Sequence, residues 1–414
     1  MSANVRVNIE NFRAIHKAEI KIDGITLVAG ENGCGKSTLS KLLYFLYKTV
    51  SNYDYIVKKQ LLHRLSNLSL YINILIREIK LSHKERQDII NTIDSNINQE
   101  DWLNLINKIE CLLKDNDQDI SKSVRLSRIT KDLLGDYYSD SEKIDFNKIK
   151  EKIKSHFKEV EGLISSRPKS LFTRELEKEF SNSKLPSKFE VFEEGDTIVS
   201  LNEDNLSIPY TIQNTIYTDT PMSISVENMR THWDDLNNLL KDGKDNSLYK
   251  DMDIVSIIQG NSYFSNDQLF GEEFKYKRLD GKTFDLLDVA TGIKAFSILQ
   301  LLLKGGHLND KTLLIIDEPE SNLHPQWIVE YARIIVNLNK HLGVKFFLAS
   351  HNPDMVSAIR YISEKEGVLE DVNFYLAEKE KETFTYNYKH LEKEIDPIFE
   401  SFNIAIDRIN KYSV

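Results

Sequence analysis

The sequence predicts an α/β fold that carries a helical insertion, and three observations predict it. A strand-like segment, Ile25–Val28, runs into a glycine cluster that is followed by an amphipathic helical pattern. Residues 51–188 are rich in Lys, Glu, Asn and Ile and place apolar residues at helical spacing. Later in the chain, the continuous apolar run Leu313–Ile316 is typical of a strand that is buried on both faces of a parallel sheet.

Composition excludes several classes of protein. The chain has 414 residues, 41% of them hydrophobic and 29% charged, which argues against a small disulfide scaffold, wholesale disorder and a membrane-spanning body. The net charge of −10 argues against a protein that binds nucleic acid through bulk positive charge. The two cysteines, Cys34 and Cys111, have no zinc-site spacing, which indicates a reduced protein. No segment approaches the roughly 18 consecutive apolar residues of a membrane span, so we expect a protein of the cytoplasm without contact to a membrane.

The first part of the α/β fold is predicted over residues 1–50. Alternating apolar residues indicate strands near Val5–Ile9 and Ile20–Ile22, before the strand that precedes the glycine cluster. The helix after the cluster is expected to bury one face, made of Leu39, Leu42, Leu43, Phe45 and Leu46.

The insertion, residues 51–188, is expected to be a compact helical bundle or a short coiled-coil arm. Its apolar stripes step by three or four residues and consist of Val57, Leu61, Leu65, Leu68, Ile72, Leu75 and Ile79, of Trp102, Leu105, Ile106, Ile109, Leu112 and Leu113, and of Phe146, Ile149, Ile153, Phe157 and Val160. Five lysines between Lys148 and Lys158 could follow a phosphate backbone, but interspersed glutamates favour a solvated helix face. The α/β fold resumes over residues 189–390, with strands at Thr197–Leu201 and Asn214–Thr218, and residues 391–414 are expected to form a capping helix.

A phosphate-binding loop is predicted at Gly30–Ser37, which fits G-x-x-x-x-G-K-[ST] between a strand and a helix. Its glycines let backbone N–H groups face phosphate oxygens, Lys36 reaches the β and γ phosphates, and the Ser37 hydroxyl is a ligand for Mg²⁺. Cys34 is interpreted as a spacer, with a redox switch as the alternative. The candidate ATP-binding residues here are Gly30, Asn32, Gly33, Gly35, Lys36, Ser37 and Thr38.

Two carboxylates end the second buried strand. The run Leu313–Ile316 is followed directly by Asp317 and Glu318. Beside a phosphate-binding loop, Asp317 is placed to bind the metal and Glu318 to activate the water that attacks the γ phosphate. The alternative is a core strand that ends in a solvated acidic turn.

At this point the chain resembles ATPases of the ABC superfamily, in the branch of SMC, RecF and OLD-type proteins. Asp317–Pro325 is similar to the acidic strand end and D-loop of that branch, and Phe346–Pro353 resembles the strand that holds its switch histidine. The resemblance implies an ABC-type head, with a P-loop core sheet and an antiparallel β lobe, in which His351 contacts the γ phosphate. Catalysis is then assigned to Lys36, Glu318 and His351, and the metal to Ser37 and Asp317.

The same resemblance implies a signature motif, which one subunit presents to the nucleotide of its partner. The best match is Ala290–Lys294, where Thr291 replaces the usual serine and Gly292 follows it. Lys294 is either a contact to the partner's nucleotide or a solvated first-turn lysine. Arg13, in a segment that resembles the opening turn of RecF and SMC heads, is implied to lie near the phosphates. Gln213 and Gln259 are the candidates for the Q-loop glutamine.

The resemblance implies an ATPase that uses ATP and Mg²⁺, forms an ATP-dependent homodimer and acts as a conformational switch. Residues 352–414 contain no D-x-D, so we expect no Toprim nuclease of the OLD type. Similar bacterial proteins commonly belong to anti-phage defence systems and control a separately encoded nuclease or toxin. The alternative is a DNA-repair or chromosome-maintenance ATPase that binds DNA directly. Two further interpretations are disfavoured: a HEPN-type ribonuclease, on the common spacing of Arg77 and His83, and a transporter subunit.

Overall fold

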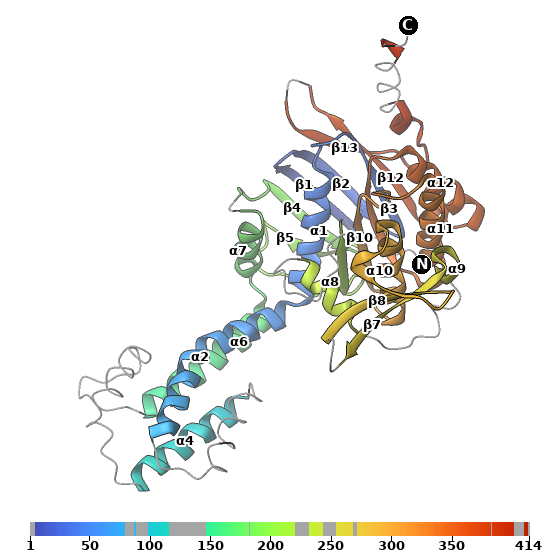
Figure 1. Cartoon of the computed structure of the whole chain (residues 1–414). Coiled ribbons are helices and arrows are strands. Elements are labelled where there is room, and N and C mark those ends of the chain that lie inside the picture. Colours follow the sequence, from blue (N-terminus) through green and yellow to red (C-terminus); the bar gives the residue numbers. More distant parts are fainter. Residues whose placement is uncertain are drawn as a thin grey trace. The chain divides into compact units, whose positions relative to one another are not determined.

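The computed structural model describes residues 5–78, 87, 98–115, 146–181, 183–219, 232–242, 254–267, 271–381, 383–400 and 410–412. The chain forms two compact units, one made of Met1–Ser51 with Lys169–Val414 and one made of Asn52–Pro168 (Figure 1). No helix within the described ranges is both long and apolar enough to cross a membrane.

The first unit is built on a ten-stranded sheet in the order β5-β4-β1-β2-β13-β12-β3-β11-β10-β6. These strands are β1 (Val5–Phe12), β2 (Ile15–Ile22), β3 (Ile25–Ala29), β4 (Lys188–Glu193), β5 (Asp196–Ser200), β6 (Asn214–Thr218), β10 (Thr312–Asp317), β11 (Lys345–Ser350), β12 (Val372–Lys379) and β13 (Tyr386–His390). Strands β12, β3, β11, β10 and β6 are parallel, whereas β5, β4, β1 and β2 pair antiparallel. The predicted α/β class, a P-loop core sheet with an antiparallel β lobe, is therefore confirmed.

The burial of the strands explains this division. Every residue of β3, β10 and β11 is buried, as a parallel strand covered on both faces requires. Strands β1 and β2 instead alternate between buried and more exposed residues, as expected when one face of an antiparallel sheet meets solvent. A smaller antiparallel sheet has the order β7 (Gly260–Asp267), β8 (Gly271–Arg278) and β9 (Thr283–Asp285).

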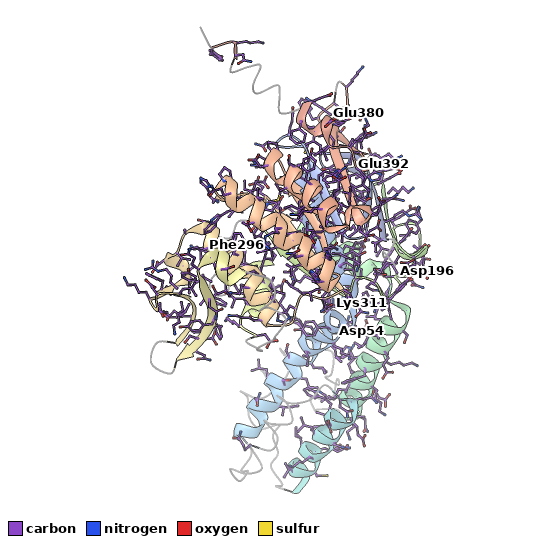
Figure 2. All side chains as sticks on the ribbon, turned by 90° about the vertical axis from the view of Figure 1, so that its right-hand side faces the viewer. Asp54, Asp196, Phe296, Lys311, Glu380 and Glu392 are labelled. Atoms are coloured by element: carbon purple, nitrogen blue, oxygen red, sulfur yellow. The ribbon has the colours of Figure 1, made fainter. Side chains whose placement is uncertain are left out.

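The helices of the first unit pack against its sheets and against one another. They are α1 (Lys36–Ser51), α7 (Lys169–Glu179), α8 (His232–Leu240), α9 (Ile254–Ile258), α10 (Thr291–Lys304), α11 (Pro325–Leu342) and α12 (Pro353–Glu366), with the short helices η4 (Leu286–Asp288) and η5 (Leu369–Asp371). Helix α1 packs against β6, β10 and β11, and its predicted apolar face is buried. Helices α10, α11 and α12 share a core with β3, β10 and β11. Phe296 of α10, labelled in Figure 2, meets Tyr331 of α11 edge to face, with 5.1 Å between ring centroids.

The second unit is helical and comprises α2 (Tyr53–Glu78), α4 (Gln99–Asp115) and α6 (Phe146–Ser166). Helix α6 packs against both α2 and α4. The predicted stripes are buried from Val57 to Ile72, from Trp102 to Ile109 and from Ile149 to Val160, whereas the side chains of Leu75, Ile79 and Leu113 lie outside the described residues.

The limits of this unit differ from the expected insertion. The unit ends at Pro168, and α7, which we expected within the insertion, belongs to the first unit. Lys150 and Lys154 pair with Glu110 and Glu151 at 2.6 and 3.1 Å, which supports the solvated-face interpretation of the lysine series. His83 of the ribonuclease-like spacing and residues 401–409 of the expected capping helix lie outside the described residues.

Candidate functional site

The glycine-rich loop joins β3 to α1 and depends on two glycines with left-handed backbone. Gly33 and Gly35 have φ values of 84° and 95°. A Cβ on Gly35 would lie 3.2 Å from side-chain atoms of both Ile15 and Tyr388, whereas a Cβ on Gly33 would meet no atom within 4 Å. The loop therefore needs glycine at Gly35 for backbone conformation and for close packing.

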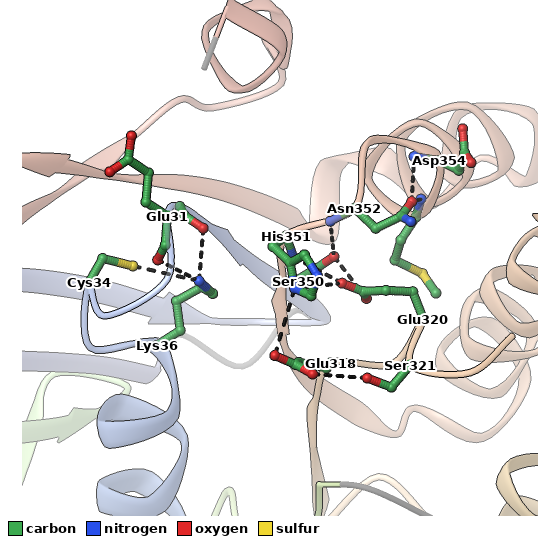
Figure 3. A network of polar contacts seen from close by, with 12 residues as sticks. Glu31, Cys34, Lys36, Glu318, Glu320, Ser321, Ser350, His351, Asn352 and Asp354 are labelled. Carbon is green, nitrogen blue, oxygen red and sulfur yellow. Dashed lines mark hydrogen bonds and ion pairs between the residues drawn. The ribbon is translucent and has the colours of Figure 1, made fainter. Parts of the chain in front are cut away.

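Lys36 opens helix α1 and its side chain turns back onto the loop. The ammonium donates to the carbonyl oxygens of Gly30 and Glu31, at 2.8 and 2.9 Å (Figure 3). The backbone N–H groups of the first turn of α1 have no partner within the helix, so this end is suited to an anion. The loop thus places a cation beside a helix N-terminus, an arrangement that can bind a phosphate group.

Cys34 is packed inside the loop. Its side chain is buried, and its backbone carbonyl accepts a hydrogen bond of 3.0 Å from the Tyr388 hydroxyl. Burial raises the pKa of the Cys34 thiol, which leaves little thiolate at neutral pH. These observations favour the spacer interpretation over a redox switch.

Asp317 ends β10 on the same sheet edge as the loop, with β11 between their strands. Its Oδ1 atom is buried and has no hydrogen-bond partner among the described residues. Burial raises the pKa of the Asp317 carboxyl, and the nearby Ser37 hydroxyl and Lys36 ammonium oppose that shift. A buried oxygen without a partner beside a hydroxyl is the hard donor set that Mg²⁺ prefers, so these residues fit the predicted metal.

A third strand end contributes residues that sequence reasoning missed. The Tyr217 hydroxyl, on β6, donates to Asp317 Oδ2 at 3.4 Å. Asp219, just after β6, adds a negative charge that also raises the pKa of Asp317, and it lies 3.3 Å from His232 Nε2. The sequence predicted the strand Asn214–Thr218. Because the carboxyl ends of parallel strands meet at one edge of the sheet, the end of this strand could have identified both residues.

Glu318 is the first residue after β10 and combines a fixed backbone with an accessible side chain. Its backbone is left-handed, with φ of 56°, and its N–H donates to the Ala349 carbonyl at 2.8 Å. The carboxylate is 44% exposed, and Ser321 Oγ donates to it at 2.9 Å. A water molecule can therefore reach this carboxylate.

His351 follows β11 directly and faces two carboxylates (Figure 3). Its Nδ1 atom lies 3.7 Å from Glu318 Oε1 and 3.4 Å from Glu320 Oε1. Sequence reasoning also missed Glu320, which was included only as part of the segment that resembles a D-loop and was given no role of its own. The structure thus brings the loop, Asp317, Glu318 and His351 to one edge of the sheet.

Arg13 lies in the turn between β1 and β2, next to Ala14, whose Cβ would lie 3.4 Å from a Cβ on Gly35. The guanidinium donates to the Phe180 carbonyl at 2.9 Å and to Ser183 Oγ at 3.1 Å. The turn therefore borders the loop, while the side chain binds the segment after α7.

The signature candidates lie at the start of α10, which begins at Thr291. Gly292 is buried, and a Cβ there would lie 2.9 Å from the Trp327 ring. Lys294 is 8% exposed and its ammonium donates to the Leu287 carbonyl at 2.6 Å, so the side chain is not solvated and is bound within its own chain. Among the described residues, no hydrogen bond or ion pair joins these three residues to the loop of the same chain.

Of the two Q-loop candidates, Gln213 precedes β6, and its N–H donates to the Lys311 carbonyl just before β10. Because β6 and β10 run parallel, this is the sheet edge opposite to Asp317. Gln213 is therefore excluded from the site.

Most of the chain matches one protein family. Residues 5–356 match the family described as the AAA ATPase domain. Comparison with the curated proteins gave no match. Similar solved structures include an SMC head bound to the C-winged helix domain of ScpA, at 9% identity, 96% coverage of this chain, 99% of that chain and a TM-score of 0.41.

Two further similar structures are the SMC head domain from Thermotoga maritima and the ADP conformation of an ATP-binding cassette of an ABC transporter. The first has 9% identity, coverage of 95% and 100%, and a TM-score of 0.36. The second has 11% identity, coverage of 99% of both chains, and a TM-score of 0.37.

Proposed function

Because the chain belongs to the family of AAA ATPase domains, we propose that it binds ATP with Mg²⁺ and hydrolyses it at the edge where β3, β10 and β11 end. The observation that carries the proposal is the meeting of a glycine-rich loop, a buried unpartnered carboxylate oxygen and an accessible carboxylate at that one edge. Each of these groups has a separate task in phosphoryl transfer.

Binding rests on the loop and the start of α1. The N–H groups of the loop and the Lys36 ammonium hold the β and γ phosphates, and Lys36 exchanges the carbonyls of Gly30 and Glu31 for phosphate oxygens. Ser37 and Asp317 hold Mg²⁺, which, when bound, offsets the negative charge of the phosphates.

Hydrolysis rests on Glu318 and His351. The Glu318 carboxylate accepts a proton from a water molecule, whose oxygen forms a bond to the γ phosphorus while the bond to the β–γ bridging oxygen breaks and ADP leaves. His351 contacts the γ phosphate by its ring. The exposure of Glu318 and its position 3.7 Å from His351 support this assignment.

Steady-state hydrolysis and nucleotide binding test this assignment. Lys36→Ala should weaken ATP binding by about 10-fold to 100-fold, since a hydrogen bond to a charged group contributes about 1.5–3 kcal/mol. Glu318→Gln should keep ATP binding but slow turnover by about 100-fold or more, as expected for loss of a general base. Unchanged turnover in Glu318→Gln would remove that residue from its role.

We also propose that ATP joins two copies of the chain, so that Thr291, Gly292 and Lys294 of one copy complete the nucleotide site of the other, with the Lys294 ammonium exchanging the Leu287 carbonyl for a phosphate oxygen. Support comes from the place of these residues at a helix start that lacks polar contact with its own loop in the described part of the chain. Hydrolysis then releases the dimer, and ATP acts as a conformational switch.

The switch is proposed to control a separately encoded nuclease or toxin in anti-phage defence, an assignment that the motif resemblance supports. Purification of the chain from its intact operon should then yield a stably bound neighbouring gene product. Purification of the chain alone, together with DNA-stimulated hydrolysis that weakens with salt, would instead favour an ATPase that binds DNA directly.

A further inference from the structure

Glu320 is a buried carboxylate that the proposed mechanism does not use. It lies in the loop between β10 and α11, and its side chain is 4% exposed, against 44% for Glu318. A buried carboxylate is costly unless its oxygens accept hydrogen bonds, so its contacts indicate what it holds in place.

Both oxygens of Glu320 bind the segment that carries His351. Oε2 accepts a hydrogen bond from Ser350 Oγ at 2.9 Å, and Oε1 accepts one from the His351 N–H at 3.0 Å (Figure 3). Ser350 Oγ in turn accepts from the Asn352 N–H at 3.1 Å, and Asn352 caps α12. The carboxylate therefore ties the loop after β10 to the turn after β11.

The same carboxylate faces the imidazole ring. Glu320 Oε1 lies 3.4 Å from His351 Nδ1, closer than Glu318 Oε1 at 3.7 Å. An ionised carboxylate only accepts hydrogen bonds, so this geometry favours a proton on Nδ1 and leaves Nε2 as the ring atom available to a ligand. Because Glu320 is buried and doubly hydrogen-bonded, whereas Glu318 is accessible, Glu320 is the fixed partner of the two.

We propose that Glu320 is a positioning residue that holds His351 in the tautomer protonated at Nδ1, with Nε2 directed to the nucleotide, and so leaves Glu318 to act on water. The inference rests on the proposed function and deepens it, because it assigns Glu320 to the imidazole ring of His351 and Glu318 to the attacking water. Carboxylates that accept the remaining ring N–H orient histidine ligands of metals in the same way, and their loss typically lowers metal affinity or activity about 10-fold to 100-fold.

The test is Glu320→Gln, which keeps the size of the side chain but replaces one acceptor oxygen by a donor amide. Ring ¹⁵N chemical shifts of His351, assigned through His351→Gln, report the tautomer in the full-length, nucleotide-free protein. Glu330→Gln on α11 is the matched control, because Glu330 pairs with Arg333 at 2.8 Å outside the site.

In the wild type, we expect the signature of a ring protonated at Nδ1. In Glu320→Gln, we expect a shift towards protonation at Nε2, a kcat lower by about 10-fold to 100-fold and a KM for ATP within about twofold of wild type. Glu330→Gln should change neither tautomer nor kcat. A Glu320→Gln protein that loses thermal stability but keeps tautomer and kcat would overturn the proposal, because Glu320 would then be only structural.

A second variant and the hydrolysis rate of the wild type also test the proposal. If Glu320→Gln does not fold, Ser350→Ala removes the hydroxyl that holds Oε2 and should produce a smaller shift of the same sign; an unchanged ring would contradict the proposal. Absence of hydrolysis in the wild type would refute the proposed function, whereas the tautomer of the nucleotide-free protein would still decide the role of Glu320.

Discussion

The Tyr217 hydroxyl lies 3.4 Å from Asp317 Oδ2, while Asp317 Oδ1 has no hydrogen-bond partner among the described residues. One oxygen of the carboxylate is thus held by a neighbouring strand and the other remains for a ligand. Burial raises the pKa of Tyr217, so the phenol stays a neutral donor at physiological pH. The relationship links Asp317, the proposed metal ligand, to β6, a strand outside the recognised motifs.

Tyr217→Phe removes this hydrogen bond and keeps the ring, whose centroid lies 4.6 Å from that of His232. A net hydrogen bond is worth about 0.5–1.5 kcal/mol, so Mg²⁺-dependent ATP binding should weaken by about 2-fold to 10-fold. Titration of nucleotide with and without Mg²⁺ measures the effect. The expected loss appears only with Mg²⁺; an equal loss without the metal would argue against a role through Asp317.

Gly35→Ala should destabilise the protein more than Gly33→Ala. Both residues have positive φ, which costs an alanine about 1–2 kcal/mol, but only at Gly35 would the new Cβ also crowd Ile15 and Tyr388. Urea denaturation measures the free energy of unfolding of both variants. Because both carry similar backbone strain, the difference between them reports the crowding at Gly35. Equal losses of stability would show that the contact with Tyr388 has no energetic consequence.

Asp317→Asn should raise the free energy of unfolding at pH 7. Burial raises the pKa of Asp317 in the folded protein, so the folded state binds more protons, and this group's contribution to stability falls as pH rises above the ordinary value of 3.8. The neutral amide removes that cost. Denaturation across pH 4 to 8 should therefore show the advantage of Asp317→Asn shrinking towards low pH; an advantage that grows there would contradict the sign.

The motifs within single segments could be predicted from the sequence. The loop at Gly30–Ser37, the buried strand that ends at Asp317 and the position of His351 after an apolar strand each leave a local pattern. The apolar residues of the helical unit likewise recur at helical spacing, so its buried face could be predicted from the sequence.

What the sequence did not reveal depends on contacts between distant segments. Tyr217 reaches Asp317 only because β6 pairs with β10 across a long stretch of chain. The role of Glu320 requires the separate loop that carries Ser350 and His351. Helix α7 has a helical pattern like the insertion, and only packing assigns it to the first unit.

The central claim, an ATPase that joins two copies of itself around ATP, is tested most directly by the solution mass of Glu318→Gln with and without Mg-ATP. This variant should bind ATP without releasing it through hydrolysis, so the account predicts a doubling from the monomer mass of 48.0 kDa on addition of Mg-ATP. A mass that stays the same while ATP is bound would contradict the account and, with it, the assignment of Thr291, Gly292 and Lys294 to the partner's nucleotide.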